Sequence, residues 1–186
     1  MNLLGIPYTI IPSKSDELKK ITTTCSRFVQ DNALLKAREV AGQVKDGIVI
    51  GADTIVYVGG KKIIGKPKDL KQANEHLKLL MSRPHWVYTG IALIDSASKN
   101  ELVDYEKTKV YMDKMKDEEI DAYFKKVSPL DKAGSFDIQG KGAFFIRRIE
   151  GCFYNVVGLP LRKLYQMLKK SGIKVFILYF FFKLFF

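Results

Sequence analysis

The sequence predicts an α/β protein built on a mixed β-sheet. Segments typical of strands and of helices alternate along the chain, without the strict strand–helix–strand repetition of an all-parallel sheet. The length of 186 residues, with 47% hydrophobic and 27% charged residues, is typical of one globular domain with a sizeable core. The pattern contains no internal repeat and no interdomain linker.

Apolar patterning and turn residues define the expected elements. Apolar runs and alternating segments predict strands at Tyr8–Ile11, Ile48–Val58, Lys61–Ile64, Trp86–Ile94, Glu101–Met112 and Ala143–Ile149. Helical spacing or an acidic start predicts helices at Cys25–Val44, Leu70–Met81, Asp117–Phe124 and Leu161–Lys170.

Turn and cap signals separate these elements. Leu3–Pro7 reads as the last turn of a helix, and Gly59–Gly60 as the turn of a hairpin. Asp31 or Asn32 can cap the second half of the helix that begins at Cys25, and Asp69 stands near the start of the next helix. We expect loops or turns at 129–140 and 151–160. His85 is expected to be structural.

The composition restricts the compartment and the partners. Cys25 and Cys152 lack metal-ligand spacing, and no signal peptide opens the chain, so we expect a reducing cytoplasm. The net charge of +11 could favour a nucleic acid, an anionic membrane or a polyphosphate substrate. The charge is mostly scattered lysine without a recognition motif, which favours a solvated surface over nucleic-acid binding. The apolar tail Val175–Phe186 is too short to span a bilayer, so we expect no membrane partner.

One carboxylate stands inside an apolar run that predicts a buried strand. Asp53 interrupts Ile48–Val58, and burying an unpaired charge is costly because the charge loses its hydration. Such an acid usually has a metal, a cation or a mechanism as its partner. Lys66 follows between Gly65 and Pro67, where it is rigidly presented. A carboxylate and a lysine facing one cleft suggest metal-assisted phosphate chemistry.

The motifs of the chain resemble one family in order and spacing. They are Leu3-Leu4-Gly5-Ile6-Pro7-Tyr8, Lys36-Ala37, Gly51-Ala52-Asp53-Thr54, Gly65-Lys66-Pro67, Arg83-Pro84-His85-Trp86-Val87-Tyr88-Thr89-Gly90, Asp131-Lys132-Ala133-Gly134, Ile138-Gln139-Gly140 and Asn155-Val156-Val157-Gly158-Leu159-Pro160. From Leu3 to about Lys174 the sequence resembles the Maf (septum-formation-type) nucleoside triphosphate pyrophosphatases. The resemblance implies a strongly twisted mixed sheet flanked by helices, with two lobes around a cleft.

The resemblance also implies an activity and its residues. The expected reaction is hydrolysis of a nucleoside triphosphate to the monophosphate and pyrophosphate, with a divalent cation such as Mg²⁺ or Mn²⁺. Asp53 matches the proton acceptor, and Glu17 together with Asp53 matches the metal ligands. Lys36, Lys66 and Lys132 match lysines that neutralise the phosphates. The helical pattern alone would predict that Lys36 is a solvated surface lysine, and the resemblance reverses that prediction. Thr54 and Gln139 match base-selecting positions of the dTTP/UTP branch, and a homodimer is possible.

The chain departs from the family's pattern at its start, at one internal position and in its tail. The Ser-x-Ser-Pro-Arg-Arg segment with which the family opens is absent, and Asp137 stands where glycine is usual. We therefore expect residues 1–174 to form a single Maf-like domain without its first strand and phosphate loop, and the tail 175–186 to lie outside the core. The alternative to an active enzyme is a truncated, catalytically impaired protein that only binds nucleotide or a partner.

Overall fold

The computed structural model describes residues 7–18, 20–60, 63–175 and 182–185, the last four by their backbone. The predicted helical turn at Leu3–Pro7 therefore lies almost wholly outside the described residues, as do Lys61 and Lys62. The chain divides into two compact units. Unit 1 comprises residues 1–54, 89–106 and 158–186, and unit 2 comprises residues 55–88 and 107–157.

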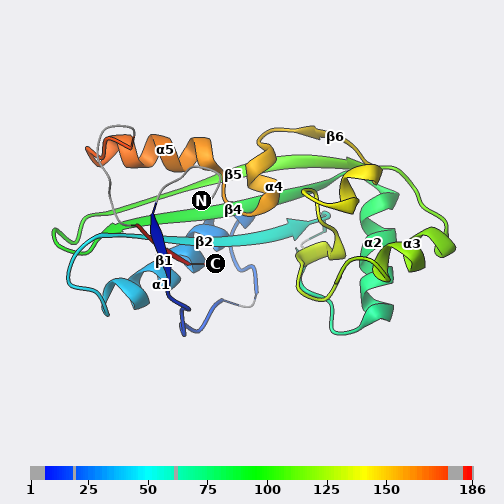
Figure 1. The fold of residues 1–186 in the computed structure, drawn as a ribbon, viewed down its shortest axis with the longest axis horizontal. Helices are drawn as coiled ribbons and strands as arrows, with labels where there is room; N and C mark the ends of the chain where they lie inside the picture. Colours follow the sequence, from blue (N-terminus) through cyan, green and yellow to red (C-terminus); the bar gives the residue numbers. More distant parts are fainter. Residues whose placement is uncertain (1–6, 19, 61–62, 176–181, 186) are drawn as a thin grey trace. The chain divides into compact units, whose positions relative to one another are not determined.

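The strands form a mixed sheet (Figure 1). Among the described residues they are β1 Tyr8–Ile10, β2 Ile48–Tyr57, β3 Ile63–Ile64, β4 His85–Asp95, β5 Glu101–Met112, β6 Ile146–Glu150 and β7 Phe182–Phe185. Their order is β1–β7–β2–β4–β5–β6, with β3 paired to β2. The pairs β1–β7 and β7–β2 are parallel, whereas β2–β3 and β5–β6 are antiparallel. The predicted α/β class with a mixed sheet is confirmed.

Four of the five helices in the described residues begin close to where the sequence predicts them, and α4 was not predicted. They are α1 Cys25–Ala41, α2 Leu70–Ser82, α3 Asp117–Phe124, α4 Phe153–Val157 and α5 Leu161–Lys170, with 3₁₀ turns at Ala133–Ser135 and Lys141–Phe145. The hydroxyl of Thr24 caps α1 by accepting from the backbone N–H of Arg27, and Asp69 caps α2. The prediction that Asp31 or Asn32 caps a second half of α1 is wrong, because α1 runs unbroken through both.

Unit 1 is a sheet segment with one helix on each face. Val49, Ala92 and Ile94 pack with the apolar side of α1, whereas their strand neighbours pack with α5. Those neighbours are Ile48, Ile50, Ile91 and Leu93. Successive residues of a strand point to opposite faces, so this alternation follows directly from the sequence. Figure 1 shows α1 and α5 on opposite sides of β2 and β4.

Unit 2 has its own hydrophobic core. Leu77 and Leu80 of α2 and Ile120 of α3 pack with Val110 of β5, all of them fully buried. His85, the first residue of β4, is also fully buried, and its ring meets Phe136 edge-on at a centroid distance of 5.8 Å. The expectation that His85 is structural agrees with this environment.

Two segments of unit 2 differ from the prediction. The strand predicted to start at Ala143 begins only at Ile146, because Lys141–Phe145 forms a 3₁₀ turn. The carbonyl of Phe145 accepts from the N–H of Asp113, 2.8 Å away, which fixes the end of that turn. The turn predicted for 151–160 contains α4. Its buried Asn155 donates to the carbonyl of Val87, 3.0 Å away.

The apolar tail contributes a strand to the sheet. The sequence predicts residues 175–186 outside the core, yet β7 lies between β1 and β2. In the register, the backbone of Phe182 is paired with Tyr8 on one side and with Ile48 on the other. The boundary at residue 174 itself stays a prediction.

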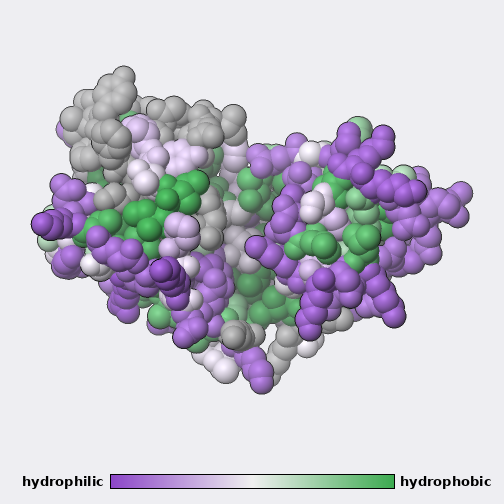
Figure 2. All heavy atoms as spheres, turned by 60° about the horizontal axis from the view of Figure 1, so that its bottom comes forward, coloured by the Kyte–Doolittle hydropathy of each residue, from purple (hydrophilic) through white to green (hydrophobic). Residues whose placement is uncertain are grey.

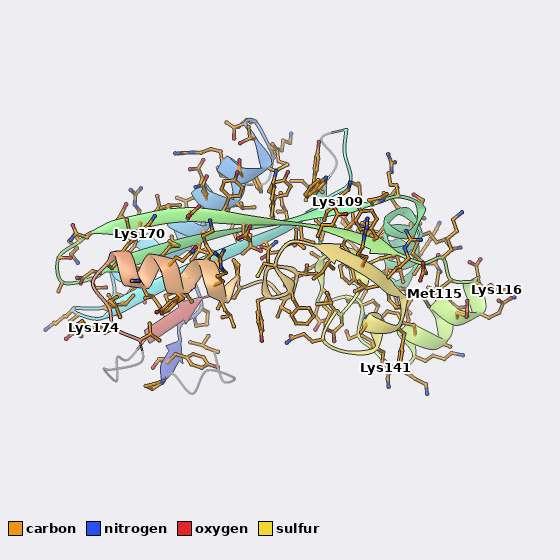
Figure 3. All side chains as sticks on the ribbon, turned by 90° about the horizontal axis from the view of Figure 1, so that it is seen from above. Lys109, Met115, Lys116, Lys141, Lys170 and Lys174 are labelled. Carbon is orange, nitrogen blue, oxygen red and sulfur yellow. The ribbon has the colours of Figure 1, made fainter. Side chains whose placement is uncertain are left out.

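The face of the molecule in Figure 2 carries many hydrophilic side chains. Figure 3 labels exposed lysines in both units, with Lys170 at the end of α5 and Lys174 beyond it in unit 1, and Lys116 and Lys141 in unit 2. This scatter agrees with a solvated basic surface. Among the described residues, every helix is too short or too polar to cross a membrane.

Candidate active site

Asp53 is a buried acid in the middle of β2. Only 8% of the residue is exposed, and its neighbours Ala52 and Ile55 belong to the apolar core. A carboxylate in such a place loses most of its hydration and needs hydrogen-bonding or charged partners. Helix α1 supplies these partners.

Two glycines allow α1 to lie directly against the strands that surround Asp53. A Cβ atom on Gly51 of β2 would overlap the carbonyl oxygen of Ala33, and one on Gly90 of β4 would overlap the carbonyl of Val29. Glycine at these positions lets helix and sheet backbones approach closely. The motifs around Gly51 and Gly90 thus place the polar side chains of α1 next to Asp53.

Lys36 of α1 forms the charged contact. Its Nζ lies 2.8 Å from Oδ1 of Asp53, 3.2 Å from Oε1 of Glu17 and 3.5 Å from the carbonyl oxygen of Ala52. The residue is 7% exposed. Burial alone would lower the pKa of Lys36, but attraction to Asp53 and Glu17 outweighs it and raises this pKa above its ordinary value. Lys36 is therefore a charged, buried partner of two carboxylates. The prediction of a solvated surface lysine, made from the helical pattern alone, is wrong.

Asn32 is the contact that the sequence did not predict. Its side chain is buried, and its Nδ2 donates to Oδ2 of Asp53 at 3.3 Å. Asn32 stands four residues before Lys36, so both side chains lie on the same face of α1. That spacing between a polar residue and a lysine was the available signal.

Thr54 follows Asp53 in β2, so its side chain points to the opposite face of the strand. Its Oγ1 lies 2.9 Å from Oγ1 of the buried Thr89 and 3.4 Å from the carbonyl oxygen of Gly158, to which it donates. The hydroxyl of Thr54 is therefore oriented by β4 and by the segment before α5. Thr89 was not among the predicted site residues.

Three predicted residues belong to unit 2. Lys66 is exposed after β3, and Lys132 is half-buried with its Nζ 3.2 Å from the carboxylate of Asp131. The N–H of Gly134 donates to the carbonyl of Gly65 at 3.3 Å, which ties the two lysine-bearing loops together. Gln139 is exposed, and its backbone N–H donates to Asp137, 3.0 Å away.

The predicted site residues thus fall into two groups. Glu17, Lys36, Asp53 and Thr54 lie in unit 1, and within it Lys36 brings Glu17 and Asp53 to one point. Lys66, Lys132 and Gln139 lie in unit 2. A single site that uses both groups stays a prediction.

The donor set of unit 1 suits a hard divalent cation. In the described part of the chain, no three side chains of the His, Cys, Asp or Glu type gather as a complete metal cage. Glu17 and Asp53 nevertheless reach the same ammonium group, so their oxygens converge on one cationic centre. Mg²⁺ is commonly bound by one or two carboxylates plus substrate phosphates, and this pair fits that mode.

Comparison with known proteins agrees with these features. A family model described as "Maf-like protein" matches residues 1–171. The chain is similar to a protein of Caldicellulosiruptor saccharolyticus, 44% identical over 172 residues that cover 90% of this chain and 86% of the relative. It is also similar to a protein of Bacillus anthracis, 44% identical over 94% of this chain and 90% of the relative. A protein of Carboxydothermus hydrogenoformans is 48% identical over 74% of this chain and 73% of the relative. Each of the three is named dTTP/UTP pyrophosphatase.

Proposed function

The chain belongs to the Maf family, and on this premise we propose that it is a hydrolase that converts dTTP and UTP to the monophosphate and pyrophosphate. The observation that carries the proposal is the buried group of Asp53, Lys36 and Glu17, in a chain 42–48% identical to proteins named for that activity. A buried ion pair is often no more stable than apolar residues of similar volume. Its presence here is therefore better explained by a chemical role than by stability.

Asp53 is the proposed general base. It accepts a proton from the water that attacks the α-phosphorus, while the bond from that phosphorus to the bridging oxygen of the β-phosphate breaks and pyrophosphate leaves. Its two oxygens are oriented separately, Oδ1 by Lys36 and Oδ2 by Asn32. A base held in one orientation is ready for proton transfer without rearrangement.

Glu17 and Asp53 are the proposed ligands of Mg²⁺ or Mn²⁺. The bound cation would supply positive charge to the phosphate oxygens of the substrate. Glu17 carries a half-exposed side chain, so it can turn between Lys36 and an incoming cation more easily than the buried Asp53.

The lysines are the proposed phosphate ligands. The three N–H groups of Lys36 face Asp53, Glu17 and the carbonyl of Ala52, so a phosphate must replace one of these partners. Glu17 is the partner that exchanges most readily because it is the exposed one. Lys66 and Lys132 add positive charge for the leaving pyrophosphate.

Thr54 and Gln139 are the proposed base-selecting residues. The Thr54 hydroxyl is held by Thr89 and Gly158, and the exposed amide of Gln139 has both a donor and an acceptor for a pyrimidine edge. The cytoplasmic nucleotide pool is the proposed source of substrate. The homodimer stays a prediction.

A panel of nucleoside triphosphates tests the proposal. We expect Mg²⁺-dependent release of pyrophosphate from dTTP and UTP, faster than from the purine nucleotides. Asp53→Asn should lower kcat by about 10²- to 10⁴-fold, the usual contribution of a general base. Asp121→Asn, which neutralises an exposed acid on α3, is the control and should leave kcat unchanged. Full turnover in Asp53→Asn would remove Asp53 from the mechanism, and binding of dTTP without hydrolysis by the wild-type chain would contradict the activity.

A further inference from the structure

The amide of Asn32 links the loop before α1 to the buried acid. Its Oδ1 accepts from the backbone N–H of Leu18 at 2.8 Å, and its Nδ2 donates to the carbonyl of Leu18 at 3.3 Å. The second N–H of the same amide points to Oδ2 of Asp53, 3.3 Å away. Only 2% of Asn32 is exposed.

The partners themselves fix the orientation of this amide. The N–H of Leu18 can only donate, so it requires the amide oxygen, and the carboxylate of Asp53 requires the amide nitrogen. A rotated amide would place oxygen against oxygen at Asp53. All three contacts therefore depend on one side-chain orientation.

These contacts determine where Glu17 lies. Glu17 precedes Leu18, a residue that is 45% exposed and so contributes little apolar anchoring. The carboxylate of Glu17 reaches Lys36, which also binds Asp53. Two side chains of one helix, Asn32 and Lys36, thereby connect both proposed metal ligands.

We propose that Asn32 is a positioning residue that fixes the Glu17 loop relative to Asp53 and orients the Asp53 carboxylate. The inference rests on the proposed function. Asn32 acts through Asp53 and Leu18 rather than on the nucleotide. It should therefore affect kcat and the Mg²⁺ requirement and leave the KM for dTTP nearly unchanged.

Two variants separate the contacts of Asn32 with Leu18 from its contact with Asp53. Asn32→Leu removes all three hydrogen bonds at similar volume. Asn32→Asp keeps an acceptor for the N–H of Leu18 but removes both donors and faces Asp53 with oxygen. Asp31→Ala is the control on the same helix, since Asp31 pairs with the exposed Arg27 instead.

The measurements are steady-state kinetics at varied Mg²⁺ and hydrogen exchange at the amide of Leu18. Loss of a hydrogen bond to a charged group that positions a metal ligand predicts a roughly 10- to 100-fold lower kcat for both variants. Both should need more Mg²⁺ for half-maximal rate. Protection of the Leu18 amide should vanish in Asn32→Leu and persist in Asn32→Asp, and Asp31→Ala should match the wild type.

The outcomes distinguish this inference from the proposed function. If the wild type hydrolyses dTTP but Asn32→Asp retains kcat and its Mg²⁺ dependence, the positioning role is overturned while the activity stands. Unchanged Leu18 protection in folded Asn32→Leu would overturn the loop anchor. A wild-type chain without hydrolysis would overturn the proposed function, and the catalytic part of the inference with it.

Discussion

Replacing Lys36 by methionine removes one charge from the buried pair and keeps a side chain of similar length. At the 2.8 Å between Nζ and Oδ1 of Asp53, Coulomb attraction is worth about 6 kcal/mol at an effective dielectric constant of about 20. The loss of hydration on burial offsets part of this attraction. Removing one partner of such a pair typically costs about 3–5 kcal/mol in free energy of unfolding. We expect about 3 kcal/mol for Lys36→Met, because Asn32 still donates to Asp53.

A double-mutant cycle isolates the pair. Asp53→Asn should cost less than Lys36→Met, since Lys36 keeps Glu17 as a partially exposed partner. The double variant has no buried charge at this position, so its loss should fall short of the summed single losses by at least about 2 kcal/mol. Urea unfolding followed by circular dichroism provides the free energies, and similar m-values would show that the unfolded states are comparable.

A surface pair on the same helix provides the control. Arg38 and Glu101 form two contacts of 2.7 and 2.8 Å, as short as that of Lys36, but the arginine side chain is 57% exposed. Arg38→Met should therefore cost less than about 1 kcal/mol. A loss below about 1 kcal/mol for Lys36→Met, or additivity in the cycle, would refute the view that burial makes the Lys36–Asp53 pair important.

Two further predictions concern helix packing and acid stability. Gly90→Ala should destabilise the fold by about 1–3 kcal/mol, because its Cβ would overlap the backbone of Val29. Gly42→Ala, at the open end of α1, is the control and should be neutral or stabilising. Equal melting temperatures for the two variants would contradict the close approach of α1 to β4. Burial lowers the pKa of His85 to about 4, from 6.5 in an exposed histidine, so between pH 6.5 and about 4 the unfolded chain takes up this proton and the folded chain does not. Stability should fall by about 3 kcal/mol between pH 6.5 and 4; His85→Phe should remove that part of the pH dependence in urea unfolding, and an unchanged slope would count against it.

The sequence predicted the elements where a periodic pattern met a clear start or stop. Asp69 caps α2 and Asp117 begins α3, as expected. Prediction failed where tertiary contacts decide the local structure. The Phe144–Phe145 pair is typical of a strand, but Phe145 instead ends a 3₁₀ turn bonded to Asp113. The tail has no periodicity of its own, and its strand is defined only by the backbones of β1 and β2.

The site was predictable in its acid but not in the acid's partners. A buried carboxylate in an apolar run implies a partner, yet nothing in β2 says which helix supplies it. Asn32 was interpreted as a cap, because asparagine favours helix starts. Its contact with Asp53 follows from its place one turn before Lys36, combined with the close approach of α1 at Gly51. That approach is a three-dimensional fact that spacing along the chain does not contain.

The paired state of Asp53 connects stability with the proposed chemistry. The cost of burying this acid is met inside unit 1 by Lys36 and Asn32, so the carboxylate is held in place before any substrate arrives. Because Lys36 is already paired, a phosphate of the substrate that binds Lys36 must replace one of its present partners. Glu17, the exposed member, is the partner that can leave Lys36 at little cost. Substrate and Mg²⁺ should therefore bind with positive cooperativity, because a phosphate that takes Lys36 releases Glu17 for the cation. Equal Kd values for Mg²⁺ with and without a non-hydrolysable dTTP analogue, measured on the wild-type chain, would contradict this exchange.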